Sequence, residues 1–86
     1  MFSAEKILER FRERPFRPLQ FVLTTGQTYD VYHPDLVFIL SDSIIIGLPS
    51  KQNETIADFV TRVSLFHITE LKDLPVVMNP QSNGTA

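Results

Sequence analysis

The sequence predicts a mainly β fold of the α+β class, in which one N-terminal helix precedes a small five-stranded antiparallel barrel. Three observations lead to this prediction. Apolar residues follow a helical spacing only within the first 14 positions. From residue 19 onward the pattern changes to short alternating or apolar runs of strand length. Turn-forming residues separate these runs at close intervals, which is typical of small barrels and sandwiches.

The predicted helix covers about residues 3–14. Ser3 is a good N-cap, because its hydroxyl can accept a hydrogen bond from an amide that the first turn leaves unpaired. Ile7 and Phe11 lie on one apolar stripe, with charged residues around the remaining surface. Pro15 disfavours helical geometry at the residue before it, so we expect the helix to end there.

Five strands are expected after the helix. The first two, residues 19–24 and 28–33, flank a turn at Thr25-Gly26. Two continuously apolar runs, residues 36–40 and 44–48, come next, and such runs are typical of strands buried on both faces. A last long strand is expected from about residue 58 to 71, although residues 56–62 could instead form a helical turn. The predicted core of the barrel consists of Leu19, Phe21, Leu23, Val31, Val37, Ile39, Ile45, Leu65 and Ile68.

Length and composition favour one small globular domain over residues 1–75, with a flexible tail over residues 76–86. The chain is 43% hydrophobic and 21% charged, which is too apolar for a disordered protein. It has no cysteine, so disulfides and thiolate metal sites are excluded. No apolar run reaches the roughly 18 residues of a membrane span, and the first residues do not resemble a signal peptide. A soluble cytoplasmic protein without a membrane partner is therefore expected.

The net charge of −2 is unevenly distributed, since five of the eight basic residues lie in the first 18 positions. The rest of the chain is acidic, which disfavours duplex DNA as a partner because DNA readers carry a strongly basic surface. Arginine side chains match phosphate oxygens, so the arginines of this segment are candidate nucleic-acid ligands. The alternative is a solvated helix face that Glu9 and Glu13 partly neutralise. The candidate arginines are Arg10, Arg12, Arg14 and Arg17.

Few residues suggest catalysis or metal binding. His33, Asp35 and His67 are the only candidates for metal or acid–base chemistry, and no metal-ligand, phosphate-loop or nucleophile motif surrounds them. We therefore predict that the chain is not an enzyme and has neither a cofactor nor a metal, and we interpret both histidines as structural. Phe11 and Phe16 are interpreted as an anchor for the helix, with a base-stacking platform as the alternative.

Three segments resemble the Sm-like family, in particular its Hfq-like bacterial RNA chaperones, whose fold is a helix followed by five bent strands. Arg12-Glu13-Arg14 is similar to the arginine-rich patch at the end of that helix. Leu23-Thr24-Thr25-Gly26 resembles the turn in the first Sm motif, and Leu65-Phe66-His67-Ile68-Thr69 resembles the second motif. The resemblance extends over residues 4–74.

The fourth and fifth candidate strands are apolar and free of blocking charges apart from Arg62, so we expect self-association through strand edges. The resemblance implies that the homo-oligomer is a ring and that it binds RNA with the arginines and His67.

The chain departs from the family pattern at several positions. Phe66 stands where the family has a lysine for uridine-rich RNA, and Val31 replaces a glycine of the first motif. Pro34-Asp35 shortens the next bend, and the loop over residues 49–57 is longer than in the family. The alternative function is a protein–protein interaction or structural oligomerisation module.

Overall fold

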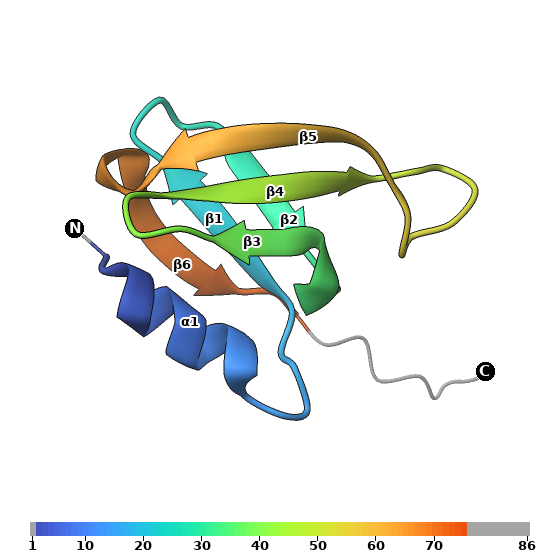
Figure 1. Cartoon of the computed structure of the whole chain (residues 1–86), viewed down its shortest axis with the longest axis horizontal. Coiled ribbons are helices and arrows are strands. Elements are labelled where there is room, and N and C mark those ends of the chain that lie inside the picture. Colours follow the sequence, from blue (N-terminus) through green and yellow to red (C-terminus); the bar gives the residue numbers. More distant parts are fainter. Residues whose placement is uncertain (1, 76–86) are drawn as a thin grey trace.

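The computed structural model describes residues 2–75, so the predicted tail over residues 76–86 lies outside the described part of the chain. Within residues 2–75, helix α1 (Ala4–Arg12) precedes six antiparallel strands arranged in two three-stranded sheets (Figure 1). The predicted class, one helix followed by antiparallel strands, is therefore confirmed. The finer prediction of a five-stranded barrel is wrong, because the described residues form six strands in two sheets that do not close into a barrel.

Helix α1 begins as its sequence indicates. The Ser3 hydroxyl accepts a hydrogen bond from the Lys6 amide at 3.2 Å, and Ile7 and Phe11 are its buried residues. The helix ends at Arg12, two residues before the predicted end, because Glu13 already has extended backbone geometry. None of the helices in the described residues is long and apolar enough to cross a membrane.

The first sheet contains β1 (Leu19–Leu23), β2 (Thr28–Val31) and β6 (Ile68–Asp73), in the order β2-β1-β6. Along β1 the burial alternates, because every second side chain points toward the core. The turn between β1 and β2 depends on Gly26, whose φ of 89° is in the left-handed region that favours glycine. Gly26 N donates to the Leu23 carbonyl oxygen at 2.9 Å and closes this turn.

The second sheet contains β3 (Val37–Ile39), β4 (Ser43–Pro49) and β5 (Ala57–Ser64), in the order β3-β4-β5. Ile44 and Ile46 point toward the core and are 0% and 1% exposed. Ile45 points to the opposite face, where it pairs with Phe38 on β3 and Arg62 on β5. The prediction that the apolar runs are buried on both faces, with Ile45 in the core, is therefore wrong. Only one face of this sheet has a layer packed against it.

Six strands occur where five were predicted, because a short 3₁₀ turn divides the long last strand. This turn, η2 (Leu65–His67), begins where Ser64 Oγ accepts from the Phe66 amide at 3.2 Å. A second turn, η1 (Pro34–Leu36), separates β2 from β3, and Pro34 lacks the amide hydrogen that a strand ladder needs. At both turns the chain passes from one sheet to the other, so the sheets form two layers rather than a closed barrel.

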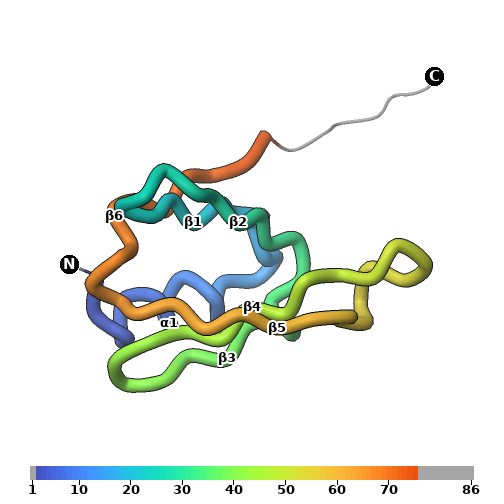
Figure 2. Tube along the Cα trace, turned by 90° about the horizontal axis from the view of Figure 1, so that it is seen from above, coloured from blue at the N-terminus to red at the C-terminus, as the bar shows by residue number. Residues whose placement is uncertain are grey.

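The two layers face each other, and α1 lies along one open side between them (Figure 2). On that side the edge strands are β3 and β6, and Figure 1 shows α1 beside both. The other edge strands, β2 and β5, are on the side away from the helix. The core therefore has three walls. It is formed by Ile7, Phe11, Leu19, Phe21, Leu23, Val31, Ile44, Ile46, Val63, Leu65 and Ile68.

Candidate interaction surface

Arg10 and Arg17 form ion pairs with acidic residues of their own chain. Arg10 Nη2 donates to Asp73 Oδ1 at 2.8 Å and to the Arg17 carbonyl oxygen at 2.7 Å. Arg17 Nη2 donates to Glu13 Oε1 at 2.8 Å, and Arg17 Nη1 donates to Asp73 Oδ2 at 3.2 Å. The Arg10 guanidinium also lies 5.6 Å from the centre of the Phe16 ring, within cation–π range. These contacts attach the end of α1 to the end of β6.

The same contacts shift the pKa values of Asp73 and Arg17. The hydrogen bond from Arg10, assisted by the charges of Arg17 and Arg10, lowers the pKa of Asp73, although desolvation acts in the opposite direction. The hydrogen bond to Glu13 and the charge of Asp73 raise the pKa of Arg17. The Arg10 side chain is only 12% exposed. Within residues 2–75 its Nη1 is buried without a hydrogen-bond partner, 3.9 Å from Glu13 Oε1. The contacts of Arg10 are therefore structural, because its side chain is mostly buried and bonded within the chain.

Arg14 and Arg12 differ in their contacts. Arg14 Nη1 donates to the Phe11 carbonyl oxygen at 2.7 Å and to the Glu13 carbonyl oxygen at 2.8 Å. It thereby satisfies backbone acceptors that the end of α1 leaves unpaired. Arg12 is exposed, and it makes no side-chain hydrogen bond or ion pair with the described residues. The four predicted arginines are therefore interspersed with carboxylates, and Arg12 alone among them has no partner in residues 2–75.

His67 lies apart from the arginines, in the turn between β5 and β6. Its carbonyl oxygen accepts from the Thr24 amide at 2.8 Å, and its Nδ1 lies 3.4 Å from Thr24 Oγ1. In Figure 1 this turn faces the N-terminal end of α1, whereas Arg10 and Arg12 belong to the last turn of the helix. The structure does not bring His67 and the arginines into one site. The contacts of His67 join the β1–β2 turn to η2.

The aromatic residues near the helix belong to the core. Phe11 is 5% exposed, and its ring centre lies 5.4 Å from that of Phe16 and 6.0 Å from that of Phe21. This packing agrees with the anchoring interpretation and leaves no open face of Phe11 for stacking on a base.

The two histidines considered for metal binding belong to different turns, since His33 precedes η1 and His67 lies in η2. His33 Nε2 lies 3.2 Å from Glu54 Oε2, and Asp35 is exposed in η1. Within residues 2–75, no group of three or more histidine or carboxylate side chains converges as a metal site would require.

Exposed apolar side chains lie on part of the outer face of the second sheet, and the sequence reasoning did not identify these residues individually. Phe38 is 71% exposed and lies opposite Ile45. Val60, 68% exposed, lies diagonally across from Ile45 and opposite Gly47, which has no side chain. We call Phe38, Ile45 and Val60 the outer patch. Large exposed apolar patches often mark sites of association on soluble proteins.

The far end of the same sheet extends beyond the first sheet, as Figures 1 and 2 show for the β4 and β5 ends and the loop between them. We call this part, residues 47–60, the projecting hairpin. Phe59 points toward the core side but is 71% exposed, because no strand of the first sheet lies opposite it. Ile56 is 55% exposed nearby. The sequence contains a signal for this exposure. Phe59 and Val60 are adjacent in one strand, so their side chains point to opposite faces and cannot both face the same core.

Comparisons with protein-family models, with curated proteins and with solved structures found no match for this chain. The function is therefore inferred from its surface. The charged groups near α1 are mostly paired within the molecule, whereas the apolar groups on β5 and the outer patch have no covering layer.

Proposed function

We propose that the protein is an interaction module that self-associates through the projecting hairpin and the open edge of β5. The observation that carries this proposal is an eight-residue edge strand with two adjacent apolar side chains, Phe59 and Val60, that are 71% and 68% exposed. An edge strand offers unpaired main-chain donors and acceptors to another chain. The exposed side chains add apolar area that is released from water on contact.

Arg62, the basic residue of β5, does not block this edge. Arg62 Nε donates to Ser43 Oγ at 3.1 Å, and its Nη2 lies 3.8 Å from Asp42 Oδ1. Arg62 is thus held over β4 rather than across the free edge. A second copy supplies an identical edge and patch, and a closed symmetric assembly pairs the edges and covers the patch. A chain of 86 residues gains from this, because alone it buries a limited share of its apolar surface.

The test is the mass of the protein in solution, measured by light scattering over a wide range of protein concentration. We expect the wild type to exceed the mass of one chain and Val60→Lys to return to it. A lysine there places a charge in the contact and leaves the core unchanged. Phe66→Lys is the matched control, since Phe66 is equally exposed at 73% but lies in η2, at the other end of β5. It should keep the wild-type mass.

A wild type that has the mass of one chain at the highest concentration contradicts the proposal. An equal loss of association in both lysine variants contradicts the proposed location, because it would show a general effect of added charge. Unfolding curves of the three proteins should coincide at low protein concentration, which verifies that the variants are folded.

RNA binding by an Sm-like assembly is a second candidate function, supported by one observation. Arg12 is exposed without an acidic partner among the described residues, and a ring would repeat it on every subunit. Glu13 and Asp73, which pair with Arg10 and Arg17, weigh against it. We therefore rank RNA binding below self-association.

Titration of the assembled protein with single-stranded RNA at low salt tests this candidate. If it holds, affinity falls steeply with added salt, because phosphate contacts release counterions. Arg12→Ala should lower the affinity, whereas Lys72→Ala, which removes an exposed charge from β6, should not. Absence of binding by the wild type, or equal binding by both variants, removes RNA from consideration.

A further inference from the structure

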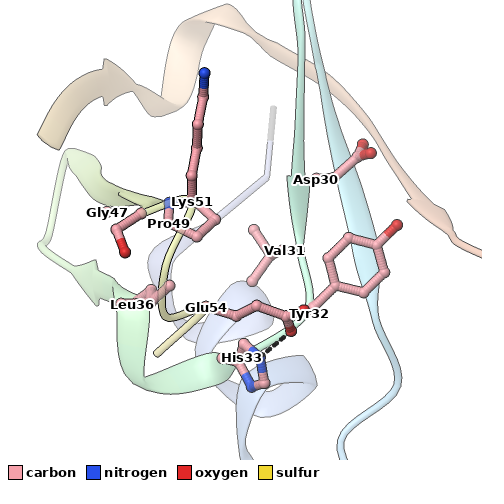
Figure 3. A pocket seen from close by; sticks show the side chains of 10 residues that line it. Asp30, Val31, Tyr32, His33, Leu36, Gly47, Pro49, Lys51 and Glu54 are labelled. Carbon is pink, nitrogen blue, oxygen red and sulfur yellow. Dashed lines mark hydrogen bonds and ion pairs between the residues drawn. The ribbon is translucent and has the colours of Figure 1, made fainter. Parts of the chain in front are cut away.

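A cavity of about 410 Å³ lies between the end of β2 and the loop that joins β4 to β5 (Figure 3). This volume is in the range of sites that hold small molecules. Its walls are largely apolar and are formed by Val31, Leu36, Gly47 and Pro49. The cavity shares the projecting hairpin with the surface proposed for self-association, because residues between Gly47 and Glu54 line it, but neither Phe59 nor a residue of the outer patch does.

The walls of the cavity are held in place by local contacts. At Gly47 a Cβ atom would lie 3.0 Å from the Ala57 Cβ and 3.2 Å from the Leu36 carbonyl oxygen, so η1 rests directly on the backbone of β4. In the loop, the Ser50 amide donates to the Ile56 carbonyl oxygen at 2.7 Å, and the Asn53 amide donates to Ser50 Oγ at 2.9 Å. The cavity is therefore bounded by an ordered loop as well as by the sheet.

Charged residues at the cavity differ in whether they already have partners. Asp30 Oδ1 accepts from Gln20 Nε2 at 2.7 Å, and Glu54 Oε2 lies 3.2 Å from His33 Nε2. Lys51 makes no side-chain hydrogen bond or ion pair with residues 2–75. Figure 3 shows its side chain starting beside Pro49 and extending away from the His33–Glu54 pair. Among the charged side chains that line the cavity, Lys51 is thus the one without a partner in residues 2–75.

We propose that this cavity binds a small apolar molecule that carries a carboxylate. The apolar body packs against Val31, Leu36 and Pro49, which removes its surface from water. The carboxylate pairs with the Lys51 ammonium, and such charge-assisted hydrogen bonds are the stronger ones in proteins. An amine in the same position would face the like charge of Lys51, while Asp30 and Glu54 already have partners.

The probe for the test is 2-naphthoate, an apolar ring system with one carboxylate, titrated into the isotope-labelled protein and followed by amide chemical shifts. Saturable shifts are expected at Val31, Leu36, Gly47 and Lys51. Naphthylmethylammonium, which has the same rings and the opposite charge, should bind at least tenfold more weakly. Lys51→Ala should weaken naphthoate binding about tenfold, whereas Lys51→Arg keeps it and Lys72→Ala leaves it unchanged.

Four results would overturn the proposal. These are the absence of saturable shifts, equal or tighter binding of the ammonium probe, unchanged naphthoate binding by Lys51→Ala, and shifts centred on Phe38 or Phe59. The last result would mean that the probe binds the exposed apolar surface rather than the cavity. Because Lys51 is exposed, its replacement leaves the fold intact, and coincident unfolding curves verify this. Failure of this test leaves self-association untouched, since mass in solution measures that separately.

Discussion

The two sides of this small fold differ in whether their surface groups have partners within the chain. On the helix side, Arg10 and Arg17 form ion pairs with Glu13 and Asp73 of the same chain. On the β5 side, Phe59 and Val60 are apolar, exposed and have no layer over them. The charged side therefore contributes mainly to holding α1 on β6. The apolar side contributes little to the fold of a single chain and is the side that gains from a partner.

This difference has a direct consequence for nucleic-acid binding. Ion pairs between arginines and carboxylates in the same chain lower the charge that a phosphate would meet, and the pairs must separate before an arginine can bind it. An apolar patch carries no such competing partner. The exposed apolar residues of β5 are therefore stronger support for self-association than the arginines near the helix are for RNA binding.

The largest expected effect separates the two faces of β4. Ile44→Asp places a carboxylate among core residues, and we expect it to unfold the domain, because burying an unpaired charge costs several kcal/mol, comparable with total stability. Ile45→Asp changes the next residue, which faces outward between Phe38 and Arg62, and should cost about 1 kcal/mol or less. Denaturant unfolding at low protein concentration measures both. Similar losses in the two variants would show that the outer patch is part of the core.

The sequence was sufficient for the elements with a clear local signal. The Ser3 cap, the apolar stripe of α1 and the alternation along β1 each depend on neighbouring residues, so their patterns could be read directly. The run Ile44-Ile45-Ile46 has no alternation, and burial of one face or both gives the same pattern. Which face is covered depends on the position of the other sheet. That is a tertiary fact, and for this reason Ile45 was misplaced.

The surface was harder to predict than the fold. The arginines were identified as a group, but their pairing with Asp73 joins residues that are 63 and 56 positions apart in the sequence. The cavity beside Lys51 likewise combines β2, η1 and the β4–β5 loop, and no motif marks such a combination. Local spacing carries no information on contacts of this kind.

A smaller effect is expected on the helix side. Arg10→Ala removes a mostly buried guanidinium that bonds to Asp73 and to a backbone carbonyl, and we expect a loss of about 1–3 kcal/mol of unfolding free energy. Arg12→Ala is the matched control on the same helix turn, and its effect should be about 0.5 kcal/mol or less because Arg12 has no partner in the described residues. If the two variants lose the same stability, the ion pairs do not hold the helix.

The smallest expected effect is on the acid dependence of stability. Arg10 lowers the pKa of Asp73 below its ordinary value of 3.8, so the folded protein binds a proton at this carboxyl less readily than the unfolded chain does. The stabilisation is therefore fully present above the ordinary pKa and is lost as the pH falls through the lower, folded pKa. Asp73→Asn should lose stability at neutral pH and show a flatter decline in acid, measured by unfolding at several pH values. Because Asp73 is exposed, salt should reduce the difference between the two proteins. If the decline in acid has the same slope in the variant, other carboxylates account for it, and the Arg10–Asp73 contact contributes to the position of the helix without contributing to its pH dependence.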